Sequence, residues 1–181
     1  MKKLLEKITS IWVIVAISVL VGFLIFVLPL VSNFLIRKLN TPIIPDTMIF
    51  YSPTILNNLA EVYLDEGIKA FILSKYTFDI IWPLAYLFSL TVIMGHLYNI
   101  LKQFSHALWF PLIAFVSDIT ENILLVVFFN QYPTSTGILG YIASGFTALK
   151  WVMIALCLVF ILIFIGKIRK NRLQKEVLND E

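Results

Sequence analysis

The apolar stretch from residue 111 to residue 132 is interrupted near its centre by two carboxylic acids and an amide. About twenty apolar residues are enough to cross a bilayer core of roughly 30 Å. One charge at the bilayer midplane costs about 2.5 to 3.5 kcal/mol even on insertion-derived scales, so two such acids need partners. Asp118, Glu121 and Asn122 are spaced so that they share one face of a helix. That face must contact protein or water rather than lipid.

The composition of the chain is typical of an integral membrane protein. Of its 181 residues, 60% are hydrophobic and only 14% are charged, whereas soluble proteins have about a quarter charged residues. The net charge of +3 is concentrated at the termini, which favours attraction to a membrane surface over nucleic-acid binding. We therefore expect an all-α integral membrane protein with one domain, residues 1–181, and the lipid bilayer as its main partner.

Cysteine and histidine usage excludes two kinds of chemistry. The single cysteine, Cys157, cannot form an intramolecular disulfide or a cysteine metal site. The two histidines, His96 and His106, are too few for a zinc site with three nitrogen ligands. The sequence leaves open which cofactor or metal, if any, the protein uses.

Four long apolar runs predict membrane-spanning helices. They cover about residues 11–36, 77–100, 107–130 and 138–165. The first run is longer than the apolar region of a signal peptide, about 7 to 15 residues, so we interpret it as an uncleaved span. The expected fold is a bundle of four transmembrane helices.

The extracytoplasmic segment, residues 37–76, contains one further helical pattern. Ser52 followed by Pro53 is a typical helix start, and apolar residues recur at helical spacing until Gly67 offers a stop. This pattern predicts a short amphipathic helix. It is either a lid over the mouth of the bundle or an interfacial helix that rests on lipid.

Basic residues predict the orientation of the bundle. Nine lysines and arginines lie at the two termini and at Lys102, including the tail at residues 166–181, against four in residues 37–76. The positive-inside rule then places both termini in the cytoplasm and the bundle in the plasma membrane.

Polar residues follow one stripe of the second span and one edge of the fourth. The stripe in the second span contains Asp79, Tyr86, Ser89 and His96, and the edge in the fourth contains Ser144, Thr147 and Lys150. Pro83 should bend the second span and free a backbone carbonyl close to Asp79, which is a common way to build a polar pocket in a membrane helix.

The predicted depths of Asp118 and Lys150 in the membrane indicate that the third span pairs with the fourth. At about 1.5 Å per residue, Asp118 and Lys150 both lie roughly 18 Å below the outer ends of their spans. The two spans are joined by a short turn and must be antiparallel neighbours, so Lys150 can pair with Asp118 or Glu121. With Asp79 included, three acids and one base leave about −2, which protons, a cation, a cationic ligand or water must offset.

Four short stretches resemble a group of small bacterial four-span membrane proteins without an assigned function. The stretches are Tyr51-Ser52-Pro53, Asp79-Ile-Ile-Trp82-Pro83-Leu-Ala-Tyr86, Asp118-Ile-Thr-Glu121-Asn122 and Lys150-Trp151. The resemblance implies that these stretches belong to one site. It carries over no activity, substrate or catalytic residue.

These observations lead to one expected function and two alternatives. We expect an outward-facing polar cavity that binds a small or amphiphilic ligand or a cation, lined by Asp79, Tyr86, Asp118, Glu121, Asn122 and Lys150. One alternative is a structural or regulatory subunit in which the buried ion pairs only fix packing. The other is an intramembrane enzyme that acts on a lipid-borne substrate, although no nucleophile motif or phosphate-binding loop is present. The oligomeric state is left open.

The predicted orientation can be tested by labelling. A reporter fused after Glu181 should be cytoplasmic, and a cysteine introduced near Asp46 should react with an impermeant reagent added from outside, because the basic residues concentrate at the termini. Labelling of that cysteine only in inverted vesicles would overturn the orientation.

Overall fold

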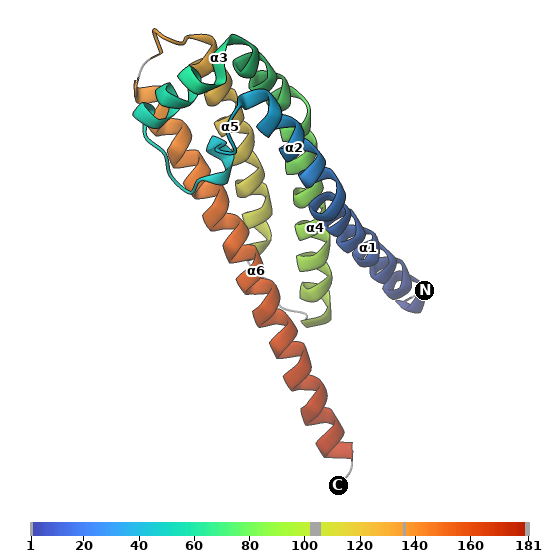
Figure 1. Ribbon diagram of the computed structural model, residues 1–181. Coiled ribbons are helices and arrows are strands. Elements are labelled where there is room, and N and C mark those ends of the chain that lie inside the picture. Colours follow the sequence, from blue (N-terminus) through green and yellow to red (C-terminus); the bar gives the residue numbers. More distant parts are fainter. Residues whose placement is uncertain (1, 102–105, 136, 180–181) are drawn as a thin grey trace.

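The computed structural model describes residues 2–101, 106–135 and 137–179, and all regular structure within these ranges is helical (Figure 1). Four of its helical stretches are long and apolar enough to cross a membrane, as expected of a multi-pass membrane protein. They are Ile11–Leu39, Pro53–Leu101, His106–Asn130 and Gly137–Gln174.

The first of these stretches is built from three consecutive elements. Helix α1 (Lys2–Gly22) leads through a π-helical turn, η1 (Phe23–Val27), into α2 (Leu28–Leu39). Pro29 follows the wide turn and cannot donate a backbone hydrogen bond, and such irregular turns are where a helix absorbs a proline. The stretch ends at Asn40, whose left-handed backbone (φ 56°, ψ 18°) is typical of a helix C-terminus.

Helix α3 (Pro53–Tyr76) begins where the sequence predicts but continues further. Ser52 Oγ accepts a hydrogen bond from the Ile55 N–H at 3.3 Å, which confirms the predicted start. The predicted stop at Gly67 is wrong, because α3 continues to Tyr76. A Cβ on Gly67 would lie 3.1 Å from the Lys38 carbonyl oxygen. Gly67 therefore allows α3 to pass close to α2, and the break in α3 lies instead at Leu64 (φ 56°, ψ 179°).

The remaining elements form the long part of the bundle. Helix α4 (Phe78–Leu101) is followed by the 3₁₀ turn η3 (His106–Trp109), helix α5 (Phe110–Asn130) and the long helix α6 (Gly137–Asn179). Helices α5 and α6 pack against each other, α4 packs against both, and α1 packs against α4. Helix α3 contacts α2, α4, α5 and α6, and it lies at the end of the molecule opposite the two termini (Figure 1).

Two apolar clusters lie on either side of a polar zone on α5. One cluster contains the stacked rings of Tyr63 and Phe129, with centroids 5.8 Å apart, together with Leu125. The other contains Met94 and Ala114. The acidic face of α5 at residues 118–122 lies between Ala114 and Leu125 along the helix, so the polar site is enclosed by apolar packing toward both ends.

Candidate functional site

Lys150 lies at the centre of the buried polar site. Its ammonium Nζ is 3.2 Å from Asp118 Oδ1 and 2.7 Å from Glu121 Oε2. The three residues are 5%, 4% and 0% exposed. The predicted ion pair between Lys150 and the acids of α5 is therefore confirmed. The antiparallel packing of α5 and α6 places these side chains at the same level along the bundle.

Helix α4 contributes two further contacts to this site. The Tyr86 hydroxyl donates to Asp118 Oδ2 at 3.0 Å, and Asn122 Nδ2 donates to the backbone carbonyl of Asp79 at 2.9 Å. Pro83 has no N–H to offer the carbonyl four residues earlier, so the prediction of a freed carbonyl at Asp79 is confirmed. Asn122 is only 5% exposed, yet its Oδ1 has no hydrogen-bond donor in the part of the chain that the structure describes.

A second ionic group, which the sequence analysis did not identify, surrounds Lys75. Its ammonium lies 3.0 Å from Asp79 Oδ2 and also pairs with Asp46 Oδ2. Lys75 is 2% exposed, and the sequence, which counts it only among the basic residues outside the spans, does not predict this burial. The spacing of four residues between Lys75 and Asp79 is a signal that could have revealed this pair. Asp46 lies in the short 3₁₀ turn η2 (Pro45–Thr47), where no periodic pattern marks it.

Tyr51 attaches the segment before α3 to the buried site. Its N–H donates to Ser144 Oγ at 2.9 Å, and its hydroxyl accepts from Thr147 Oγ1 at 3.0 Å and lies 3.5 Å from Glu121 Oε1. Burial, reinforced by the Glu121 carboxylate, raises the pKa of the Tyr51 hydroxyl, so this group stays protonated and is a donor toward Glu121. The sequence places Tyr51 in one of the four stretches that resemble other proteins, but it indicates none of these contacts. Each residue of the polar edge formed by Ser144, Thr147 and Lys150 therefore makes a polar contact with a residue outside α6.

The residues of the sequence-predicted site meet as direct contacts. Asp118 contacts both Tyr86 and Lys150, and Lys150 also contacts Glu121. Asn122, on the same helix as the two acids, binds the backbone carbonyl of Asp79. The sequence predicts that they line an outward-facing cavity, whereas in the structure all but Asp79 are 5% exposed or less. Ser89, from the same stripe, donates instead to the Ala16 carbonyl at 2.9 Å and joins α4 to α1.

The two ionic groups act on each other as one set of charges. Burial raises the pKa of the Asp46 carboxyl, but the charges of Lys75 and of Lys150 outweigh it, and the pKa lies below its ordinary value. The set has four carboxyl groups, Asp46, Asp79, Asp118 and Glu121, and two ammonium groups, Lys75 and Lys150. The two ammonium groups offset half of the acidic charge. If every group is ionised, the set therefore carries a net charge of about −2. This is the same excess that the sequence predicts from three acids and one lysine. In the described part of the chain, no three His, Cys, Asp or Glu residues are arranged to hold a metal ion.

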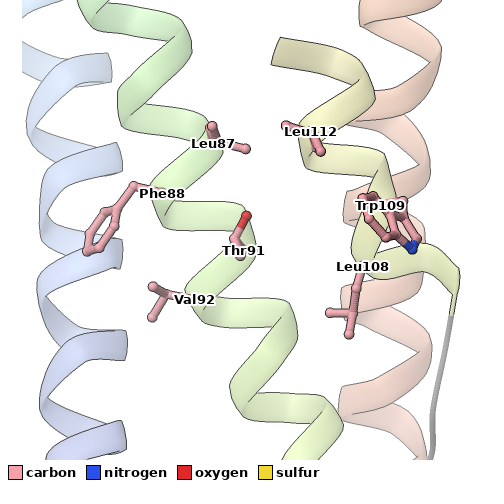
Figure 2. Close-up of a pocket in the computed structure, with 7 residues that line it drawn as sticks. All are labelled: Leu87, Phe88, Thr91, Val92, Leu108, Trp109 and Leu112. Atoms are coloured by element: carbon pink, nitrogen blue, oxygen red, sulfur yellow. The ribbon is translucent and has the colours of Figure 1, made fainter. Parts of the chain in front are cut away.

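An apolar groove of about 450 Å³ lies apart from this site, between α4 and the start of α5 (Figure 2). Leu87 on α4 and Leu112 on α5 face each other across it, and Thr91 is its one polar lining residue. Phe88 points toward α1, where the centroid of its ring lies 6.3 Å from that of Trp12. None of the sequence-predicted site residues lines this groove.

Comparisons with protein-family models, with curated proteins and with solved structures found no match to this chain. Its class is therefore defined by its own fold and site. It is an all-helical protein with four helices able to cross a membrane, and it contains a buried set of paired acids and lysines.

The contact between Asp46 and Lys75 predicts a specific loss of stability in acid. The pKa of Asp46 is lowered in the folded protein. The pair with Lys75 therefore stabilises the fold fully when the pH is above the ordinary aspartate pKa of about 3.9, and this stabilisation is lost as the pH falls through the folded-state pKa. Asp46→Asn should cost about 1.5 to 3 kcal/mol at neutral pH, the range for a hydrogen bond to a charged group. Its melting temperature should then fall less than that of the wild type between neutral pH and about pH 3.

Thermal unfolding in detergent at both pH values measures this difference. Glu61→Gln is the control, because Glu61 is an exposed acid on α3 outside any ion pair among the described residues, and its variant should follow the wild-type curve. Equal acid sensitivity in the wild type and Asp46→Asn would contradict a stabilising pair at Asp46.

Proposed function

We propose that this protein binds a cation within the membrane and that the bound cation is a proton. The observation that carries the proposal is a buried set of four carboxyl groups that faces only two ammonium groups. A low-dielectric site does not hold two uncompensated negative charges. Protonation of a carboxylate removes one of them without any additional ligand.

The unpaired oxygen of Asn122 supports the same conclusion. A buried acceptor without a donor costs about 1 to 3 kcal/mol, and Asn122 Oδ1 has no donor among the described residues. An ionised carboxylate only accepts hydrogen bonds, whereas a protonated one donates. A proton held by a neighbouring acid would therefore supply both the missing charge and a donor.

Close packing favours a proton over a larger cation. Glu121 is fully buried, and Tyr51 is fully buried across it. A cationic amphiphile would carry the same charge, but it would have to displace Tyr51 or Lys150 to reach the acids. We propose further that the bundle lies in the plasma membrane with both termini in the cytoplasm and α3 at the outer end. The excess of basic residues near the termini supports this orientation.

A purely structural role is the second candidate. Its specific support is that Lys75 and Lys150 each contact two carboxyl groups, an arrangement that fixes the positions of α5, α6 and the segment before α3. Such a role needs no exchange of protons. The two candidates differ in whether a carboxylic acid inside the bundle is protonated at neutral pH.

Infrared difference spectroscopy of the carboxyl groups tests the proposal. The purified protein should show a protonated-acid band that persists at about pH 7, because the buried set has more carboxylates than ammonium groups to pair with them. The two acids on α5 lie close together, so they should titrate as a coupled pair. The band should disappear or shift in Asp118→Asn or Glu121→Gln.

Glu61→Gln is the control variant, since Glu61 is exposed and should not contribute to this band. Added divalent cations should leave the band unchanged. If all acids titrate near pH 4 and no band remains at neutral pH, the protein does not hold a proton in this site. A band that moves on addition of a divalent cation would assign the site to a metal ion instead.

A further inference from the structure

A polar cleft of about 460 Å³ lies between the end of α2 and the middle of α3, apart from the buried ionic site. Arg37 and Lys38, in the last turn of α2, contribute one part of its lining, and Asp65 and Glu66 on α3 contribute another. The four side chains are exposed. No ion pair joins them within the described ranges, so both signs of charge are available to a ligand.

The walls of the cleft are held in place by backbone contacts. Leu64 has φ 56° and ψ 179°, a conformation that is rare for any residue with a side chain and that persists only where the surrounding structure enforces it. Gly67 lets α3 approach the Lys38 carbonyl so closely that a Cβ would lie 3.1 Å from it. The distance between the basic and acidic linings is therefore set by the α2–α3 crossing rather than by mobile side chains alone.

The position of the cleft indicates the source of its ligand. Arg37 and Lys38 end the first helical stretch able to cross a membrane, Ile11–Leu39, which places them at the level of lipid headgroups. Large apolar side chains remain uncovered on both helices: Leu64, which lines the cleft, is 63% exposed, and Phe34, one turn before Lys38 on α2, is 52% exposed. A ligand with a charged headgroup and acyl chains would contact both kinds of surface.

We propose that this cleft binds a phospholipid headgroup that carries a phosphate and a primary ammonium, as in an ethanolamine phospholipid. Arg37 and Lys38 would bind the phosphate oxygens through charge-assisted hydrogen bonds. Asp65 and Glu66 would accept hydrogen bonds from the ammonium. The two basic and two acidic charges match a zwitterion. A choline headgroup has no N–H to donate, and a glycerol headgroup has no ammonium for the acids.

Ligand-induced stabilisation of the purified full-length protein tests this assignment. Melting temperatures in detergent are measured against dioctanoyl phosphatidylethanolamine, dioctanoyl phosphatidylcholine, dioctanoyl phosphatidylglycerol and free phosphorylethanolamine. The ethanolamine lipid should raise the melting temperature with a half-saturating concentration about tenfold below those of the other two lipids, as expected for one additional hydrogen bond to a charged group. Free phosphorylethanolamine should bind more weakly than the lipid. If it binds equally well, the headgroup chemistry holds but the acyl chains contribute nothing.

Paired variants separate the two halves of the cleft. Arg37→Gln/Lys38→Gln should weaken the effect of the ethanolamine lipid about tenfold, and Asp65→Asn/Glu66→Gln should abolish its advantage over the choline lipid. Lys69→Gln, an exposed lysine on α3 outside the cleft, should behave as the wild type. The single variants Arg37→Gln and Asp65→Asn replace either double variant if it does not fold. Equal stabilisation by all three lipids, or equal weakening by Lys69→Gln, would overturn the assignment.

Discussion

The structure depends on the rule that a charge inside a membrane must be paired. Lys150 on α6 lies between Asp118 and Glu121 on α5, so the two helices are fixed at one register. Tyr51 then joins the same group through Glu121 and Thr147. Through these contacts an irregular segment of the chain, which has little helical structure of its own, is held against the bundle.

The same requirement accounts for the second ionic group and for its connection to the first. Lys75, near the end of α3, takes Asp46 and Asp79 as partners. The carbonyl of Asp79, released by Pro83, is in turn bound by Asn122 on α5. Backbone and side chains thus form one polar layer across α3, α4, α5 and α6. Its excess of carboxylates over ammonium groups is the feature that favours proton binding over packing alone.

The parts of this layer that lie on regular helices could be predicted from sequence. Helical spacing placed Asp118 and Glu121 on one face, and depth along antiparallel spans paired them with Lys150. The resemblance had grouped Tyr51 with this site, but the contacts of Tyr51 and of Asp46 could not be predicted, because residues outside helices have no periodicity that fixes where they point. The predicted helix stop at Gly67 failed for a different reason. Glycine serves both as a helix stop and as a site of close approach between helices, and only the packing of α2 against α3 decides between these roles. The ligand-binding role of the six predicted residues remains a proposal.

The most direct test of the central claim is whether Lys150 and Glu121 stabilise the fold as a pair. The free energy of unfolding is measured in mixed micelles at about pH 8 for Lys150→Met, Glu121→Gln and the double variant. Removing Lys150 alone leaves buried carboxylates without a partner and should cost about 3 to 5 kcal/mol. The double variant should recover part of this loss, with a coupling free energy above about 1 kcal/mol. Additive losses, or a Lys150→Met protein as stable as the wild type, would contradict the account.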